Sequence, residues 1–403
     1  MRRTLMGLGI MLGAAAAALA QTSTPPTPPP PKTWVDYTTV KADVRYRFER
    51  IDDESKTNAA GKTFSRNRDR IRARLGVEVK PNDLLKVGIG ISTGQSDPIS
   101  GNQTIGDGFG KKEARLELGY LDYSLFGERA YEVHAFAGKM KNPFLTLPDD
   151  LIWDGDATPE GLALRGQYIH GPITYLANAA YQWIQERNPG SEAQLIAGQA
   201  ALRVQFMPEI LMTAGGAYYA YQRLRGYDVI DWEGKDNAYG NSTVAGTVSG
   251  TTTHKAWATG FKPVVYFGQV DFWPGEIPGL GRPMLSLYAH GISNTWKDAS
   301  GEPVKYKAGQ MFGMSLGKAK NPRTAELGYS YTKLEKDATP GLLTDSDRYG
   351  GGTDGKGHKI YMRYQIAKGL QAAVTYFDNK RKISDPKATN DYQRLQVDVQ
   401  AAF

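Results

Sequence analysis

Residues 70–79 read Arg-Ile-Arg-Ala-Arg-Leu-Gly-Val-Glu-Val, and this stretch decides the class of fold. Its apolar side chains occupy every second position from 71 to 79, while Arg70, Arg72 and Arg74 occupy positions between them. Successive side chains of a β-strand point to opposite faces, so the segment is predicted to be a strand with one apolar and one charged face. Residues 41–48 repeat the pattern.

The same alternation continues to the end of the chain and predicts sixteen strands. They are expected at 41–48, 70–79, 85–92, 111–125, 130–141, 161–170, 173–186, 192–206, 210–224, 255–272, 283–297, 305–318, 323–336, 358–367, 370–382 and 391–403. Short turns, such as 81–83 and 170–172, alternate with long segments, such as 94–110 and 225–254. This asymmetry is typical of an outer-membrane barrel. The expected fold is therefore all-β, a single transmembrane antiparallel β-barrel with short periplasmic turns and long extracellular loops.

A soluble β-sandwich or propeller is the alternative, because alternation also suits a sheet with one wet face. Two features favour a closed barrel. The neighbouring arginines at 70, 72 and 74 share one face and need water or carboxylates, which a hydrated lumen supplies. An open sheet of sixteen strands would also leave two long unpaired edges.

The N-terminus is expected to consist of two segments that precede the barrel. Residues 1–20 have a basic start, an apolar run and the small-residue ending Ala18-Leu19-Ala20, which predicts a cleaved signal peptide; a core helix is the alternative. Residues 21–33 are rich in proline and are expected to be a disordered leader, with a spacer or a partner ligand as alternatives. The barrel is then expected at 34–403.

Composition excludes several function classes. The 403 residues contain no Cys, which rules out disulfides, thiolate metal sites and thiol catalysis. The net charge is +7, or +5 without Arg2 and Arg3, so no nucleic-acid partner is expected. The five His are scattered, and no HExxH or Gly-x-Ser-x-Gly motif occurs. We expect no enzyme, cofactor or metal, with a rim hydrolase using His290 and Ser286 or Ser293 as the alternative.

The last strand and one central stretch carry a family resemblance. Residues 393–403 place Leu395, Val397, Val399, Ala401 and the terminal Phe403 on one face. This segment resembles the C-terminal assembly strand of bacterial outer-membrane proteins, which implies that barrel-insertion machinery reads Phe403. The chain also resembles bacterial general porins, and in particular a family labelled putative porins. The stretches concerned are Ala137-Gly-Lys-Met-Lys-Asn-Pro-Phe144, Asp149-Asp-Leu-Ile-Trp-Asp-Gly-Asp156 and Pro159-Glu-Gly-Leu-Ala163.

The resemblance covers about residues 34–403 and implies how the pore is narrowed. In general porins the third long loop folds into the barrel, so residues 142–160 are expected to be the constriction loop. This loop has no Lys or Arg and carries five acids: Asp149, Asp150, Asp154, Asp156 and Glu160. Opposite it we expect a pore-lining basic ladder: Arg45, Arg47, Arg70, Arg72, Arg74 and Arg115.

Two such charged walls produce a field across the pore and set ion preference, and six arginines against five acids favour anions. The alternatives are structural ion pairs for the ladder and a solvated surface loop for the acids. A Ca²⁺ site is a further alternative, although the acids lack the EF-hand pattern.

The expected function is an outer-membrane porin, a water-filled channel for passive diffusion of small hydrophilic solutes and ions in contact with outer-membrane lipid. The resemblance also implies a homotrimer. A sugar-selective or organic-acid-selective channel and a non-channel adhesin or structural protein are the alternatives. Aromatic residues such as Trp183, Tyr218, Tyr219 and Tyr221 are expected to form an interfacial girdle rather than a sugar-stacking track.

Overall fold

The structure is a computed structural model that describes residues 33–57, 61–128, 130–188, 190–232, 234–249, 252–276 and 282–403. The expected signal peptide, 1–20, and residues 21–32 of the expected leader lie outside the described residues. Residues Trp34–Tyr37 form the short 3₁₀ helix η1. No helix in the described ranges is long and apolar enough to cross a membrane.

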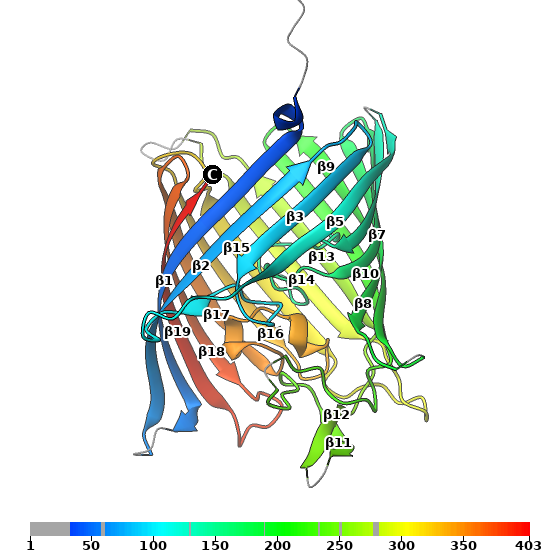
Figure 1. The fold of residues 1–403 in the computed structure, drawn as a ribbon, viewed down its shortest axis with the longest axis vertical. Coiled ribbons are helices and arrows are strands. Elements are labelled where there is room, and N and C mark those ends of the chain that lie inside the picture. Colours follow the sequence, from blue (N-terminus) through cyan, green and yellow to red (C-terminus); the bar gives the residue numbers. More distant parts are fainter. Residues whose placement is uncertain are drawn as a thin grey trace, which may run out of the picture. The chain divides into compact units, whose positions relative to one another are not determined.

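Residues Tyr37–Phe403 contain a closed antiparallel sheet of sixteen long strands, in which neighbours in the chain pair with each other (Figure 1). The strands are β1 (Thr38–Thr57), β2 (Thr63–Val79), β3 (Leu85–Thr93), β5 (Ala114–Gly127), β6 (Tyr131–Lys139), β7 (Glu160–His170), β8 (Ile173–Gln185), β9 (Ala193–Met207), β10 (Ile210–Gln222), β13 (Pro263–Phe272), β14 (Leu285–Asn294), β15 (Ala308–Gly317), β16 (Ala325–Leu334), β17 (Gly355–Ala367), β18 (Leu370–Arg381) and β19 (Asn390–Ala402). Pairing of β1 with β19, from Asp43 opposite Ala402 to Asp53 opposite Tyr392, closes the barrel. The prediction of an all-β, sixteen-stranded barrel is confirmed.

Three short strands lie in the connections. In the second loop (94–113), β4 (Gln103–Thr104) pairs with β2. In the fifth loop (223–262), β11 (Thr243–Ser249) and β12 (Thr252–Trp257) form a separate hairpin. The strand expected at 255–272 is therefore wrong over its first residues. The chain leaves the hairpin and passes Gly260, where a Cβ would lie 2.2 Å from the indole of Trp296, before β13 begins.

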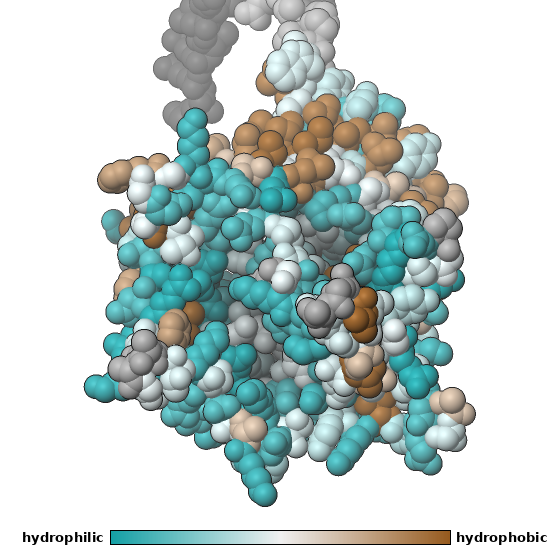
Figure 2. Space-filling view, turned by 60° about the horizontal axis from the view of Figure 1, so that its bottom comes forward, coloured by the Kyte–Doolittle hydropathy of each residue, from teal (hydrophilic) through white to brown (hydrophobic). Residues whose placement is uncertain are grey.

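Short turns and long loops occupy opposite ends of the barrel. The first residue of β1 and the last of β19 lie with the short turns at the top of Figure 1, and the β11–β12 hairpin lies with the long loops at the bottom. At the loop end, β1 and β2 continue well past the expected limits of 48 and 70, where residues 49–53 of β1 pair with residues 64–68 of β2. Viewed toward the loop end, the surface is largely hydrophilic and hollowed near its centre (Figure 2).

The outward face of the barrel is apolar. Large exposed side chains alternate along the strands, for example Ile89 and Ile91 on β3, Leu162 and Leu164 on β7, and Ile360 on β17. Such a band is what lipid contact requires. Of the expected girdle residues, Trp183 and Tyr218 are exposed, whereas Tyr219 and Tyr221 are buried inside the barrel.

The inward face divides the barrel into two unlike sides. On β1, β2 and β17–β19 it is charged, as the alternation predicts. On β8–β10 and β13–β15 it is largely apolar and buried, and it packs against loops. The inward residues of this second side include Leu195, Ala197, Ala217, Tyr219, Val265, Phe267, Ile292 and Met311. The expectation of a polar inward face around the whole barrel is therefore wrong for these strands.

Candidate functional site: two loops packed inside the barrel

The third loop (140–159) packs on the apolar inward side of the barrel. Trp153 is 4% exposed, and its ring centroid lies 6.3 Å from that of Phe144 and 6.2 Å from that of Tyr219 on β10. Gln199 on β9 binds the backbone of Leu145, accepting from its N–H (2.7 Å) and donating to its carbonyl (2.9 Å). Leu147, Leu151 and Ile152 belong to the same buried cluster.

Four of the five expected loop acids meet within this buried framework. The carboxylate of Asp149 accepts from Ser330 Oγ (2.6 Å), forms an ion pair with Lys359 of β17 and lies 3.4 Å from the guanidinium of Arg348. Asp150 accepts from the backbone N–H groups of Ile152 (2.8 Å) and Trp153 (3.0 Å).

Asp156 connects the third loop to the arginines of β2. One of its carboxylate oxygens lies 3.3 Å from both Arg72 and Arg74. The same arginines bind Asp43 of β1, at 3.1 and 2.7 Å. The fifth acid, Glu160, lies apart, because as the first residue of β7 it sits opposite Lys139, which it pairs with at 2.9 Å while 59% exposed.

The seventh loop (335–354), which contains η2 (Gly341–Leu343) and η3 (Arg348–Gly350), is the second part of the site. Figure 1 draws it in orange within the outline of the barrel. Asp347 forms ion pairs with Arg47 of β1 (3.2 Å) and Arg394 of β19 (2.8 Å). The next residue, Arg348, forms an ion pair with Asp149 of the third loop.

Backbone contacts join the two loops directly. The N–H of Asp154 donates to the carbonyl of Leu343 (2.7 Å), and the N–H of Ser346 donates to the Asp154 carboxylate (2.8 Å). Sequence reasoning missed the seventh loop altogether. Its acids and Gly-rich end resemble an ordinary surface loop, and its partners lie up to 300 residues away, so no local signal marks it.

The basic ladder is longer than expected on β2 and shorter elsewhere. Arg66 and Arg68 continue the row of Arg70, Arg72 and Arg74, since all five occupy alternate positions of one strand. Arginines already occupy every second position from 66 to 70 in the sequence. They were not assigned to the ladder because the strand was expected to begin only at residue 70. Arg68 and Arg394 both pair with the fully buried Glu49.

Two ladder arginines have no carboxylate partner among the described residues. Arg45 donates to the side-chain oxygen of Asn102 (2.8 Å), and Arg70 donates to the backbone carbonyl of the same residue (2.9 Å). Arg47 pairs with Asp398 at 2.7 Å. Arg115 stands apart from the ladder: it is the second residue of β5, is 55% exposed and pairs with Glu113 at 3.0 Å.

Where these groups meet, they enclose a cavity of about 590 Å³ in which charges nearly balance. Its basic lining residues are Arg45, Arg47, Arg72, Arg74, Lys141 and Lys359. Its acidic lining residues are Glu117, Asp149, Asp150, Asp154, Asp156, Asp345 and Asp347. Basic β1 and β2 thus face acidic loops, which produces a field across the passage without a surplus of positive charge.

The loop carboxyls fall into two electrostatic groups. Lys359 and Arg348 hold the pKa of Asp149 below its usual value despite burial, and Arg394 with Arg47 do the same for Asp347. Burial and the charge of Asp345 raise the pKa of Asp154 well above its usual value. Burial and the charge of Asp347 likewise raise the pKa of Asp345, against the opposing charges of Lys359 and Arg348.

These raised pKa values predict a pH dependence of the contact between the two loops. A raised folded-state pKa means that the ionised carboxyls oppose the contact, and that the opposition disappears as pH falls through that pKa, while unfolded carboxyls protonate only near pH 4. Lowering the pH from 7.5 to 5 should therefore quieten open-channel current fluctuations. The Asp154→Asn variant should already be quiet at pH 7.5, and a pH response unchanged in that variant would contradict the assignment.

Two other kinds of site were open alternatives, a hydrolase that uses His290 and a metal site. Ser286 donates to Asp271 (2.5 Å) rather than to His290, whose Nδ1 accepts from the N–H of Leu151 (3.3 Å). Over the described ranges, no group of three or more His, Asp or Glu side chains is placed to hold a metal ion.

Comparison with known proteins gives a family and a fold. A family model described as "Putative porin" matches residues 29–242. The high-pH structure of Pseudomonas putida OprB is 12% identical, with a TM-score of 0.56, and the match covers 91% of this chain and 94% of that one. In-vitro folded Vibrio cholerae OmpT is 12% identical, with a TM-score of 0.46, and the match covers 91% of this chain and 98% of that one. A triple mutant of Rhodopseudomonas blastica porin is 9% identical, with a TM-score of 0.44, and the match covers 91% of this chain and 100% of that one. No curated protein matches the sequence. At such identities, the likeness to OprB shows the fold alone.

Proposed function

Because this chain belongs to the putative porin family and forms a porin channel of the bacterial outer membrane, we propose that small hydrophilic solutes diffuse passively through the constriction between its third and seventh loops. The ladder arginines of β1 and β2 and the acids of the loops line that passage. Arg115 and Glu160 do not line the cavity between these groups and are not part of the proposed passage.

A series of cavities that share lining residues carries this proposal. A cavity of about 810 Å³ at the loop end shares Ser346 with the constriction cavity. The constriction cavity shares Arg74, Glu117 and Lys141 with a further cavity of about 580 Å³ toward the turn end. Cavities spaced from the loop end to the turn end of the barrel support a diffusion path.

Conductance of the purified protein in planar bilayers tests the function. We expect stepwise, ohmic currents that do not saturate with neutral sugars. Absence of any current would favour the adhesin or structural alternative, and saturable block by a single neutral sugar would favour the sugar-selective alternative.

The remaining features are proposals about assembly. Cleavage after Ala20 would give a mature N-terminus at Gln21, which intact mass measures. The backbone of Phe403 pairs with Ala42 in both directions at 3.0 Å, and its exposed ring supports its role as an assembly signal. Trimer formation rests on resemblance to sixteen-stranded porins, and a monomer mass in mild detergent would remove it.

A further inference from the structure

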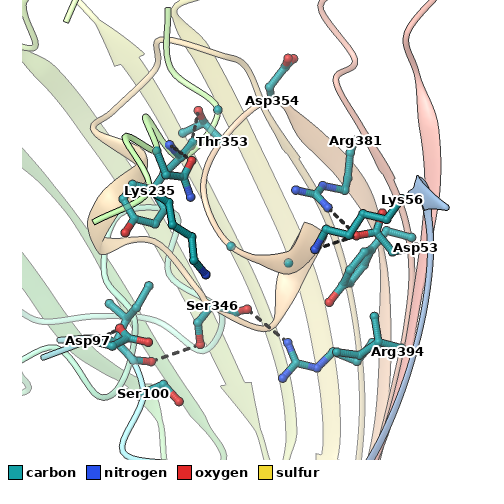
Figure 3. Close-up of a pocket in the computed structure, with 18 of the residues that line it drawn as sticks. Asp53, Lys56, Asp97, Ser100, Lys235, Ser346, Thr353, Asp354, Arg381 and Arg394 are labelled. Atoms are coloured by element: carbon teal, nitrogen blue, oxygen red, sulfur yellow. Dashed lines mark hydrogen bonds and ion pairs between the residues drawn. The ribbon is translucent and has the colours of Figure 1, made fainter. Parts of the chain in front are cut away.

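The cavity at the loop end, which we call the vestibule, differs in charge from the constriction. Figure 3 shows the vestibule with side chains from several loops and strands around it. Nine of its lining residues are basic and four are acidic. The basic ones are Lys56, Arg66, Arg68, Arg70, Lys235, Lys255, Arg381, Lys382 and Arg394; the acidic ones are Asp53, Asp97, Asp236 and Asp354. The charge surplus of the passage therefore lies at its entrance.

Some of these cations are neutralised, but others retain donors. Arg381 pairs with Asp53 at 3.0 Å. Arg394 is neutralised by Glu49 and Asp347. By contrast, Arg66 pairs with β1 through its backbone, but its side chain has no hydrogen-bond or ion-pair partner among the described residues. The Nε of Arg70 is buried without a partner. Buried donors without partners are uncommon in folded proteins, so these groups invite an acceptor from a solute.

The vestibule also has an aromatic wall contributed by the fifth loop. Trp232 and Tyr239 line it, with ring centroids 5.8 Å apart. The hydroxyl of Tyr239 donates to Asp231 (3.0 Å), which holds that ring in place. A fixed pair of rings beside guanidinium groups can bind a solute that has both an apolar ring face and a negative charge.

We propose that the vestibule captures small organic anions that carry a carboxylate or phosphate group on a ring. The charged group binds Arg66 and Arg70 of β2, and the ring lies against Trp232 and Tyr239. This inference rests on the proposed channel function and adds a solute class to it. Because the constriction itself is balanced in charge, the vestibule supplies the anion preference that the ladder alone does not.

Block of single-channel current by three matched solutes tests the proposal. Glucose 6-phosphate and glucuronate should reduce the current from the loop side at concentrations about tenfold below those required from the turn side, as expected for a few charge-assisted hydrogen bonds. Neutral glucose should not block at those concentrations. The two anions distinguish a phosphate from a carboxylate ligand, and block by either supports the site.

Two variants and a control assign the block to named residues. The double variant R66Q/R70Q should weaken block by both anions about tenfold, and Trp232→Ala should weaken it about threefold while leaving block by inorganic phosphate unchanged. Arg323→Gln, which removes one positive charge from an exposed turn at the opposite end of the barrel, is the control. Stepwise channel current in each variant, whatever its size, shows that it has folded, and block is measured relative to that variant's own open current.

Salt dependence supplies a second measurement. Anion preference from reversal potentials should be clear at 0.1 M salt, where the screening length is about 10 Å, and should weaken at 1 M, where it is about 3 Å. A channel that conducts normally but is blocked equally by glucose and the two anions, or that shows no anion preference at 0.1 M, would overturn the capture site. The proposed channel function would survive that result and fails only if no current is seen.

Discussion

Removal of residues 146–157 is expected to raise single-channel conductance about twofold or more, because the lumen of a sixteen-stranded barrel is wide enough to conduct once its internal loop is gone. The deleted segment includes Asp149 and Asp156, which join the loop to β17 and β2, and Trp153, which packs it on the apolar side of the barrel. Its loss removes one wall of the constriction and releases the seventh loop from its contact with the third. Single-channel recording measures the effect.

The control for this deletion is removal of residues 298–302, an exposed turn between β14 and β15 whose hydrogen bonds are internal to the turn. That variant should conduct like the parent protein. An unchanged conductance after removal of 146–157 would place the third loop outside the conducting path and with it the proposed constriction.

The Asp149→Asn variant is expected to lower the free energy of unfolding by about 3 kcal/mol, because it leaves Lys359 and Arg348 as buried cations without their shared carboxylate. Asp149 is 5% exposed, so little solvent is available to compensate. Denaturant unfolding in detergent micelles gives the change. Open-channel current should also become noisier, since this residue joins both loops to β17.

Glu160→Gln is the matched control, because Glu160 is an exposed acid of the same segment whose pair with Lys139 contributes at most about 1 kcal/mol. The pH dependence gives a further check. The pKa of Asp149 is lowered in the folded state, so its contribution is fully present above the unfolded pKa near 4 and is lost only as pH falls below it. The difference in free energy of unfolding between the parent protein and Asp149→Asn should therefore persist from pH 8 to pH 5. Equal effects of Asp149→Asn and Glu160→Gln would contradict the role assigned to Asp149.

Much of the barrel follows from the sequence, because strand formation depends on local alternation. The pattern of residues 70–79 and its repeats predicted sixteen strands and their order. The C-terminal strand indicated the outer membrane, and the stretches within 137–163 indicated the family. Arg66 and Arg68 were within reach of the same reasoning, since they continue the alternation of β2 toward the loop end.

The interior of the barrel was not predictable in this way. β9 and β10 carry mostly apolar residues on both faces. Local alternation does not predict this, and the packed third loop explains why the inward residues are buried. The strand assigned to 255–272 failed because its first residues, 255–257, belong to β12, which pairs with β11 in a hairpin outside the barrel sheet.

The sequence by itself determined the barrel, its strand number and the positions of the arginines on β1 and β2, because a strand's two faces are set by neighbouring residues. Only the tertiary structure decided that the seventh loop packs against the third, that the charges lining the cavity between them and β1 and β2 nearly balance, and that the surplus of cations lies in the vestibule. The physical reason is distance along the chain: Asp347 and Arg47 are 300 residues apart, and their ion pair exists only once the barrel has closed.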